Sequence, residues 1–290
     1  IFHTIMKNVF PQAKILNKLS LSKRDHLIHS IIHHYQDRRW IVVHFLYFAS
    51  LLTILKGQEK KDDRSLLYSQ ALISADFLLP DGIALALYYE YYLRQSPIKW
   101  FEVIAFMTHF SHLALPNNNG TDFIPSFLDA LEEQWINYNI TLLSAYDTNI
   151  NKPKTAIQSE IETLKQRWKK AKFVSGYNVE YQVRNNESFR KELWEQHTLQ
   201  WEDDMNVLMV ATGSPHQELW VEANKEFLKK QWYAVFTVGG LIDFLSGREK
   251  RAPHWMRNIK LEWLYRACIN PRKNKKKALS SFEVFKYIRR

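Results

Sequence analysis

Three segments of the sequence combine residue types that do chemistry with glycines that let a ligand approach the backbone. Asp81 stands between a proline and a glycine, directly after the apolar run 77–79, where a rigidly held carboxylate suits a general base. Residues 211–218 read Ala-Thr-Gly-Ser-Pro-His-Gln-Glu and residues 238–240 read Val-Gly-Gly, so a glycine turn follows an apolar run in both. Such turns suit phosphate or sugar oxygens. Together the segments predict a site for a phosphorylated ligand.

Each of the three segments also has a purely structural interpretation. Aspartate is a good helix cap, and on the sequence alone we favour capping for Asp81 by about two to one. The turn at Gly213 also fits an ordinary strand-to-helix connection with a serine cap. The pair Gly239 and Gly240 also fits a close contact between a helix and a strand.

Alternating strands and helices would bring these segments to one place. Apolar and β-branched runs predict strands at Ile41–Val43, Phe77–Leu79, Ile140–Leu143, Val207–Thr212 and Ala234–Val238, and a short one within Phe173–Val183. Helical spacing predicts a helix at Lys23–Tyr35, capped by Ser20 or Ser22, a second that follows the first strand and ends at Leu55, and a third that begins at about Ser65. Residues Ile83–Leu115 are mostly helical with a break at Pro97, and Thr121-Asp122 would cap a helix at Pro125–Tyr138. Further helices are predicted at Thr155–Lys170, at Ser188–Gln200 and from Pro215 onward. This order predicts an α/β fold, a Rossmann-like parallel sheet with helices on both faces. Ligands bind such sheets at the carboxyl ends of the strands.

The positive charge of the chain is confined to its last part. Residues 248–290 hold 14 Lys and Arg against 3 Asp and Glu, whereas residues 1–247 hold 26 against 27. We therefore divide the chain into a Rossmann-like catalytic domain, residues 1–247, and a basic helical C-terminal appendage, residues 248–290. The appendage predicts an anionic partner, either nucleic acid or a membrane surface.

The appendage also carries tryptophans at a helical spacing. Trp255, Ile259 and Trp263 repeat every four residues, which predicts one helix with an apolar edge. Tryptophan prefers the bilayer interface, and each Lys or Arg near anionic lipid is worth about 1 kcal/mol, so these residues favour peripheral membrane binding. In the alternative interpretation, Trp255 and Trp263 pack into the core and the lysines are simply solvated. For the basic run 272–277, we consider simple solvation and membrane binding equally favoured. A nucleic-acid partner is disfavoured because no recognised motif supports it and the body is nearly neutral.

No pattern in the sequence predicts a metal ion, a cofactor or a disulfide. Cys268 is the single cysteine, which fits a reducing cytoplasm. His26, His29 and His33 share one helical face, and a solvated face is the favoured interpretation because no fourth zinc ligand is visible. The run Trp40–Leu55 has sixteen uncharged residues, short of the ~20 that span a bilayer, so we expect a buried strand leading into a helix.

Four stretches taken together resemble one known family. They read PDGIAL, GTDFIPSFLDAL, ATGSPHQELWV and VGGLIDFLSGREKRAPHWMRNIKLEWLYRACINPRK. By the residues of these stretches and their order, the chain resembles the WecG/TagA/CpsF family of bacterial glycosyltransferases from residue 8 to 276. The resemblance is most specific from Val207 onward.

The resemblance implies an inverting, metal-independent transferase of cell-surface polysaccharide synthesis, peripheral on the inner face of the cytoplasmic membrane. The donor would be a UDP-sugar of the N-acetylmannosamine type, and the acceptor a sugar on a polyprenyl diphosphate. Asp81 would be the catalytic base. Residues expected to contact substrate are Gln217, Gly213, Gly239, Gly240, Thr121 and Asp122. The appendage would face membrane and lipid diphosphate with Arg266, Arg272, Lys273, Lys276, Trp255 and Trp263.

The sequence departs from the family pattern at three places. Residues 43–47 read Val-His-Phe-Leu-Tyr where members carry a Thr-x-Asn turn, residues 143–147 lack the common Gly-Gly, and residues 117–119 replace the usual arginine. The alternative function is therefore a catalytically inactive, membrane-associated relative, with a nucleic-acid-binding protein as the less favoured one. A homo-oligomer stays open.

Overall fold

The structure is a computed structural model of the chain. It describes residues 11–60, 62–108, 112–146, 155–180, 204–230, 232, 234–245, 249–269, 271 and 279–289. For residues 145–146, 155–160 and 173–180 it describes the backbone alone. The expected helix Ser188–Gln200 lies outside the described residues.

Six strands form one sheet in the order β2-β1-β6-β5-β3-β4, and every neighbouring pair is parallel. The strands are β1 Ile41–Tyr47, β2 Phe77–Asp81, β3 Tyr138–Tyr146, β4 Ala171–Glu180, β5 Met205–Ala211 and β6 Ala234–Thr237. Helix α4 (Phe48–Glu59) follows β1 and packs in the core that contains Leu46, whereas α13 (Leu241–Leu245) follows β6 and packs in the core that contains Val43, so the chain leaves these adjacent strands toward opposite faces. Ligands bind open α/β sheets at the crevice formed at such a point. The predicted α/β class with a parallel sheet is confirmed.

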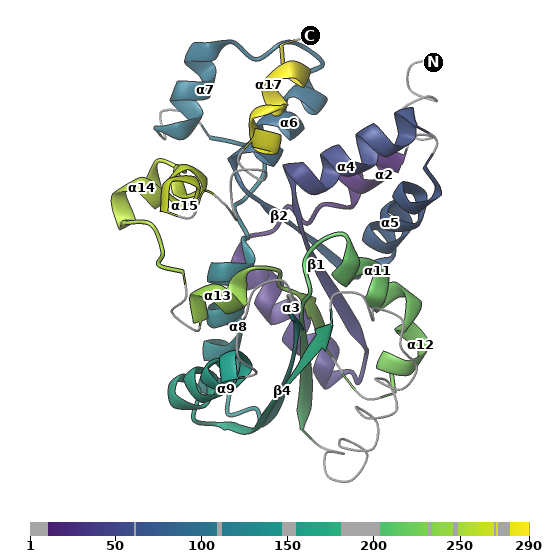
Figure 1. Cartoon of the computed structure of the whole chain (residues 1–290), viewed down its shortest axis with the longest axis vertical. Coiled ribbons are helices and arrows are strands. Elements are labelled where there is room, and N and C mark those ends of the chain that lie inside the picture. Colours follow the sequence, from purple (N-terminus) through teal and green to yellow (C-terminus); the bar gives the residue numbers. More distant parts are fainter. Residues whose placement is uncertain are drawn as a thin grey trace.

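Helices cover both faces of this sheet (Figure 1). Their bounds are α2 Pro11–Lys18, α3 Arg24–Gln36, α4 Phe48–Glu59, α5 Asp63–Ser74, α6 Ile83–Arg94, α7 Trp100–Met107, α8 Gly120–Glu133, α9 Thr155–Arg167, α11 His216–Ala223, α12 Lys225–Leu228, α13 Leu241–Leu245, α14 His254–Asn258, α15 Glu262–Ile269 and α17 Val284–Tyr287. Val43 faces a core that includes α3 and α8, and its neighbour Val42 faces a core that includes α11. Because both faces are buried, the strands read as continuous apolar runs rather than alternating ones.

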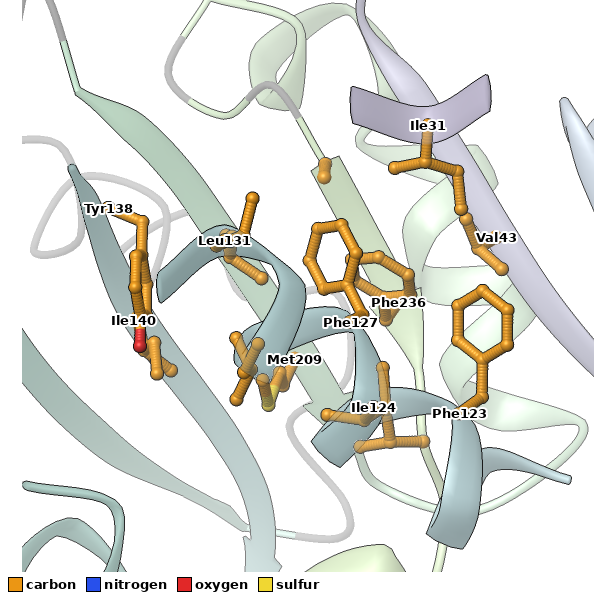
Figure 2. Packing of buried hydrophobic residues seen from close by; sticks show 14 of the residues in the cluster. Ile31, Val43, Phe123, Ile124, Phe127, Leu131, Tyr138, Ile140, Met209 and Phe236 are labelled. Carbon is orange, nitrogen blue, oxygen red and sulfur yellow. The ribbon is translucent and has the colours of Figure 1, made fainter. Parts of the chain in front are cut away.

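The largest core lies between the sheet and helices α3 and α8. Figure 2 shows Phe123, Ile124 and Phe127 of α8 beside strand residues such as Met209 and Phe236. The rings of Phe127 and Phe236 lie 5.0 Å apart at a tilt of 50°, close to the geometry that aromatic pairs prefer. This packing fixes α8 against the strands whose ends form the site described below.

Three local expectations are wrong in their details. Helix α8 begins at Gly120 and is capped by Asn119, whose side chain accepts from the N–H of Asp122, rather than by Thr121-Asp122. Helix α3 is preceded by Lys23 with no side-chain cap, so neither expected serine caps it. Strand β1 runs to Tyr47, four residues beyond the predicted end, because all of these residues are buried or nearly so.

The appendage does not form one continuous tryptophan-bearing helix. Helix α14 ends at Asn258, and Lys260 follows in the left-handed conformation with φ of 60°, which an α-helix of L-residues does not sustain. A second helix, α15, then begins at Glu262. The last helix, α17, belongs to the core of the body, where Val284 and Ile288 pack with residues of α2, α4 and α6.

The apolar run Trp40–Leu55 forms a strand that leads into a helix, as the sequence indicated, but the two meet at Phe48 rather than after Val43. Within the described ranges, no helix combines the length and the apolar character that a membrane crossing requires.

Candidate functional site

The carboxyl ends of β2, β1, β6 and β5 meet along one edge of the sheet. Tyr47 is the register partner of Asp81, and Val210 is the partner of Thr237. A cavity of about 570 Å³ lies at this edge and is lined by residues from all four strand ends. The three segments that the sequence analysis singled out therefore line a single cavity.

Asp81 closes strand β2 and does not cap the helix that follows. The residue at the N-cap of α6 is Gly82, and no side chain caps that helix. The capping interpretation, which we favoured on the sequence alone, is thus wrong. The carboxylate is partly exposed and contributes to the cavity wall instead.

Gln217 ties the two glycine turns together. Its Oε1 accepts hydrogen bonds from the N–H groups of Gly213 and Gly239, each at 3.2 Å. Both glycines have positive φ, 82° and 52°, a conformation that favours glycine. A Cβ on Gly213 would meet nothing within 4 Å, so this turn faces open space. Because these two N–H groups already donate to Gln217, they are not directed at a ligand in this structure. The contribution of the two turns to the cavity is the space that the missing side chains leave.

Glu218 fixes the orientation of the Gln217 amide. Its Oε1 accepts from Gln217 Nε2 at 2.9 Å, and the residue is fully buried. Burial raises the pKa of Glu218 to about 7, against the lowering effect of hydrogen bonds from Gln217 and Ser214. The carboxyl group therefore changes charge near neutral pH.

A cluster of buried hydroxyl groups holds the turn that contains Ser214. The Ser214 Oγ lies 2.6 Å from the Tyr68 Oη and 3.2 Å from the Ser50 Oγ. Burial raises the pKa of Tyr68 well above its ordinary value, so its hydroxyl stays protonated and able to donate. The turn is in this way attached to α4 and α5.

The appendage contributes a wall of the same cavity through Arg266 and Trp263. The guanidinium of Arg266 lies over the Phe244 ring at 4.8 Å and donates to Glu249 at 3.0 Å. A Cβ added to Gly240 would lie 3.4 Å from Arg266 Nη2, so this cation faces the glycine pair. The Trp263 ring packs edge-on against Phe282 with centroids 4.8 Å apart.

A second cavity of about 330 Å³ adjoins the first and shares part of its wall. The residues that line both are Asp81, Gly82, Ile83, Thr121, Phe244, Trp263 and Arg266. The smaller cavity adds the cations Arg257 and Lys260 and the imidazole of His112. Lys260 Nζ donates to the Phe106 carbonyl at 2.9 Å, and burial lowers its pKa. Asp81 thus lies where a glycine-rich cavity meets a cation-rich one.

The other residues expected in the site are distributed differently. Asp122 lines neither cavity; it binds Arg251 at 2.9 Å and so attaches the appendage to α8. Burial raises the pKa of Asp122, but hydrogen bonds from Asn119 and Arg251 bring it below its ordinary value. Trp255 is exposed and lines neither cavity. Arg272, Lys273 and Lys276 lie outside the described residues.

The histidines within the described residues give no sign of a metal site. In the part of the chain that the structure describes, no group of three or more His, Cys, Asp or Glu side chains gathers to hold an ion. His26, His29 and His33 are exposed, as the sequence indicated. His44 is buried, and desolvation lowers its pKa to about 3, so it stays neutral and donates or accepts at Thr237 Oγ1, 3.0 Å away. A neutral buried imidazole of this kind is a poor general base.

Two groups of site residues were missed from the sequence. Tyr47 lines the larger cavity beside Asp81, but the predicted strand stopped at Val43 and placed it in a helix. The last residue of a parallel strand faces the ligand edge of the sheet, but no local pattern in residues 44–47 indicates that the strand continues to Tyr47. Arg257 and Lys260 entered the sequence analysis only as part of the appendage's positive charge, whereas the structure places them on the wall of the smaller cavity, Arg257 in α14 and Lys260 in the break between α14 and α15.

Comparison with known proteins agrees with this arrangement. The family model described as "Glycosyl transferase WecG/TagA/CpsF family" matches residues 15–288. A relative from Bacillus subtilis (strain 168), named N-acetylglucosaminyldiphosphoundecaprenol N-acetyl-beta-D-mannosaminyltransferase, is 39% identical over 66 residues. That match spans 23% of this chain and 25% of the relative.

Proposed function

The chain belongs to the WecG/TagA/CpsF family of glycosyl transferases, and from this premise we propose that it transfers a hexosamine-type sugar from a UDP-sugar to a sugar on a polyprenyl diphosphate. The observation that carries the proposal is the position of Asp81 on the wall shared by two cavities. A transferase of this kind needs two substrates to meet at one base, and the shared wall supplies such a place.

The donor is assigned to the larger cavity. Its diphosphate lies against the glycine turns at Gly213 and Gly239, where missing side chains leave room, and opposite Arg266. The guanidinium provides charge-assisted hydrogen bonds to phosphate oxygens. Thr121, on the wall common to both cavities, is placed to hydrogen-bond the sugar.

The acceptor is assigned to the smaller cavity. Its diphosphate meets Arg257 and Lys260, and its terminal sugar hydroxyl is directed towards Asp81. With Arg266 on the shared wall, Arg257 and Lys260 give this cavity the positive charge that a diphosphate requires.

The reaction is a direct displacement at the anomeric carbon. Asp81 accepts the proton of the acceptor hydroxyl while that oxygen attacks the anomeric carbon from the face opposite the diphosphate. A new carbon–oxygen bond forms, the bond to UDP breaks, and the configuration inverts. Arg266 stabilises the charge that develops on the departing diphosphate, so the proposed step uses protein cations and no metal ion.

The name of the Bacillus subtilis relative supports N-acetylmannosamine as the transferred sugar and N-acetylglucosaminyl diphosphoundecaprenol as the acceptor. A lipid acceptor of this class places the work at the inner face of the cytoplasmic membrane. The basic appendage supports peripheral attachment there, because anionic lipid attracts its excess of 11 positive charges, 14 against 3.

The test is transfer by purified protein with a panel of UDP-N-acetylhexosamines and a polyprenyl-diphosphate-linked N-acetylglucosamine, measured as UDP release and product mass. Asp81→Asn is expected to lower kcat by about a hundredfold or more, since it removes the general base. Asp63→Asn, the same change at an exposed position, is the control and is expected to act like the wild type.

Equal rates for Asp81→Asn and the wild type would disprove the assigned base. If the wild type releases no UDP with any donor yet binds vesicles, the inactive relative becomes the better account. Binding to duplex DNA but not to vesicles would favour the nucleic-acid alternative.

A further inference from the structure

Helix α7 has an apolar face that the proposed reaction does not use. Trp100, Phe101 and Ile104 are 68%, 53% and 51% exposed, and on a helix these three positions share one side. The inward side carries Val103 and Phe106, which are buried, and Val103 together with Met107 at the helix end lines the larger cavity. A single helix therefore separates the cavity from an exposed apolar surface, and exposed apolar patches of this kind mark interaction sites.

Both ends of α7 are attached to the basic appendage. Before its first turn, the Ile98 N–H donates to the Ile288 carbonyl at 2.8 Å. At its last turn, Lys260 Nζ donates to the Phe106 carbonyl at 2.9 Å. Figure 1 shows α7 and α17 at the same end of the molecule. Helix α7 is thus attached at both ends to the segment of the chain that carries the excess of positive charge.

The polar groups of α7 are already paired or lie off the exposed face. Glu102 binds Arg94 at 2.7 Å on another side of the helix. The Thr108 hydroxyl donates back to the Ile104 carbonyl at 2.7 Å. Lys99 lies over the Phe101 ring at 5.8 Å, which keeps its charge at the helix start. An apolar face with satisfied carbonyls and a cation at its rim has the character of a helix at the lipid headgroup boundary.

We propose that the occupant of this face is an anionic lipid bilayer, and that α7 inserts Trp100, Phe101 and Ile104 beneath its headgroups. The basic appendage holds the surface by charge, and α7 supplies the apolar contact that charge alone lacks. With its inner side on the cavity wall, the inserted helix places the cavity next to the hydrocarbon from which a polyprenyl acceptor comes. This inference rests on the proposed function, because it takes the acceptor to be held in a bilayer.

The test is flotation of the full chain with vesicles of phosphatidylcholine and phosphatidylglycerol at low and high salt. We expect the triple variant Trp100→Ser, Phe101→Ser, Ile104→Ser to bind about tenfold more weakly or worse. The loss should be greatest at high salt, where screening removes the electrostatic part and leaves the apolar part. The matched control replaces Leu66, Leu67 and Trp135 by Ser; these are 44%, 56% and 80% exposed and belong to other parts of the surface. The control should bind like the wild type.

Unchanged flotation of the triple variant would overturn the proposal. So would a fall in the mass of the protein in solution with flotation unchanged, which would make this face a contact between copies of the chain. A transfer assay with a water-soluble, short-chain acceptor distinguishes failure of the α7 proposal from failure of the proposed function. The triple variant is expected to transfer sugar to this soluble acceptor but to lose transfer to an acceptor held in vesicles. A wild type that floats but transfers no sugar would refute the proposed function and leave the role of α7 standing.

Discussion

Glu218→Gln tests the account of the buried carboxyl group that orients Gln217. The glutamine keeps an oxygen to accept from Gln217 Nε2, so the hydrogen bond of 2.9 Å is retained in kind. What the substitution removes is ionisation. Any pH-dependent difference between the two proteins therefore reports the titration of this one group.

The sign and size of the effect follow from the raised pKa. Burial raises the pKa of Glu218 from 4.5 to about 7 in the folded chain. Between these values the folded state binds more protons than the unfolded state, so the free energy of unfolding falls as pH rises through this window. From about pH 5 to about pH 8 the wild type should lose roughly 2 to 3 kcal/mol relative to Glu218→Gln.

Urea unfolding at a series of pH values measures this difference directly. The control is Glu226→Gln, because that side chain is 84% exposed and its replacement should leave the pH dependence of the wild type unchanged. Parallel curves for the wild type and Glu218→Gln from about pH 5 to about pH 8 would refute the assigned titration. They would also mean that the Gln217 amide is held by a carboxylate that is always charged.

Two further predictions concern the supports of the site. Arg251→Met leaves the carboxylates of Asp122 and Glu262 without their shared cation, and urea unfolding should show a free energy of unfolding lowered by about 1 to 2 kcal/mol. Adding Asp122→Asn to this variant should change the free energy of unfolding little further. Fully additive effects of the two substitutions would contradict the pairing. Gly213→Ala forces an L-residue to φ of 82° in open space, which should lower stability by ~1–2 kcal/mol. Gly240→Ala, where φ is not positive, serves as the comparison and should show no such loss.

The sequence predicted the sheet well because its strands are buried on both faces. Runs such as Val207–Thr212 are continuously apolar, which is typical of a central strand buried on both faces. The parallel topology follows because a helix separates successive strands. Boundaries were poorer where packing decides them. Ile41–Val43 continues as a strand to Tyr47 because β2 pairs with it over that length, which no local pattern in residues 44–47 reveals.

The interpretation of Asp81 shows what sequence alone leaves open. An aspartate before a helix is a common cap, and no residue pattern here assigns the cap to Gly82. Only the path of the backbone at the end of β2 directs the carboxylate to the cavity. For Gln217, the family resemblance implied contact with substrate. The structure adds that its Oε1 accepts hydrogen bonds from two backbone N–H groups, which no sequence motif indicates.

The appendage shows that a charge count does not say which of its cations are free to meet a partner. Of its described cations, Arg251 binds Asp122 and Glu262, Arg266 binds Glu249, and Lys260 binds a carbonyl of α7. Trp263, expected at the membrane, instead lines both cavities. The appendage still exposes Trp255, Ile269 and Leu279, so its own apolar side chains add to any membrane contact. Helix α7 is attached to the appendage at both of its ends, so its apolar face is positioned to enter the same bilayer.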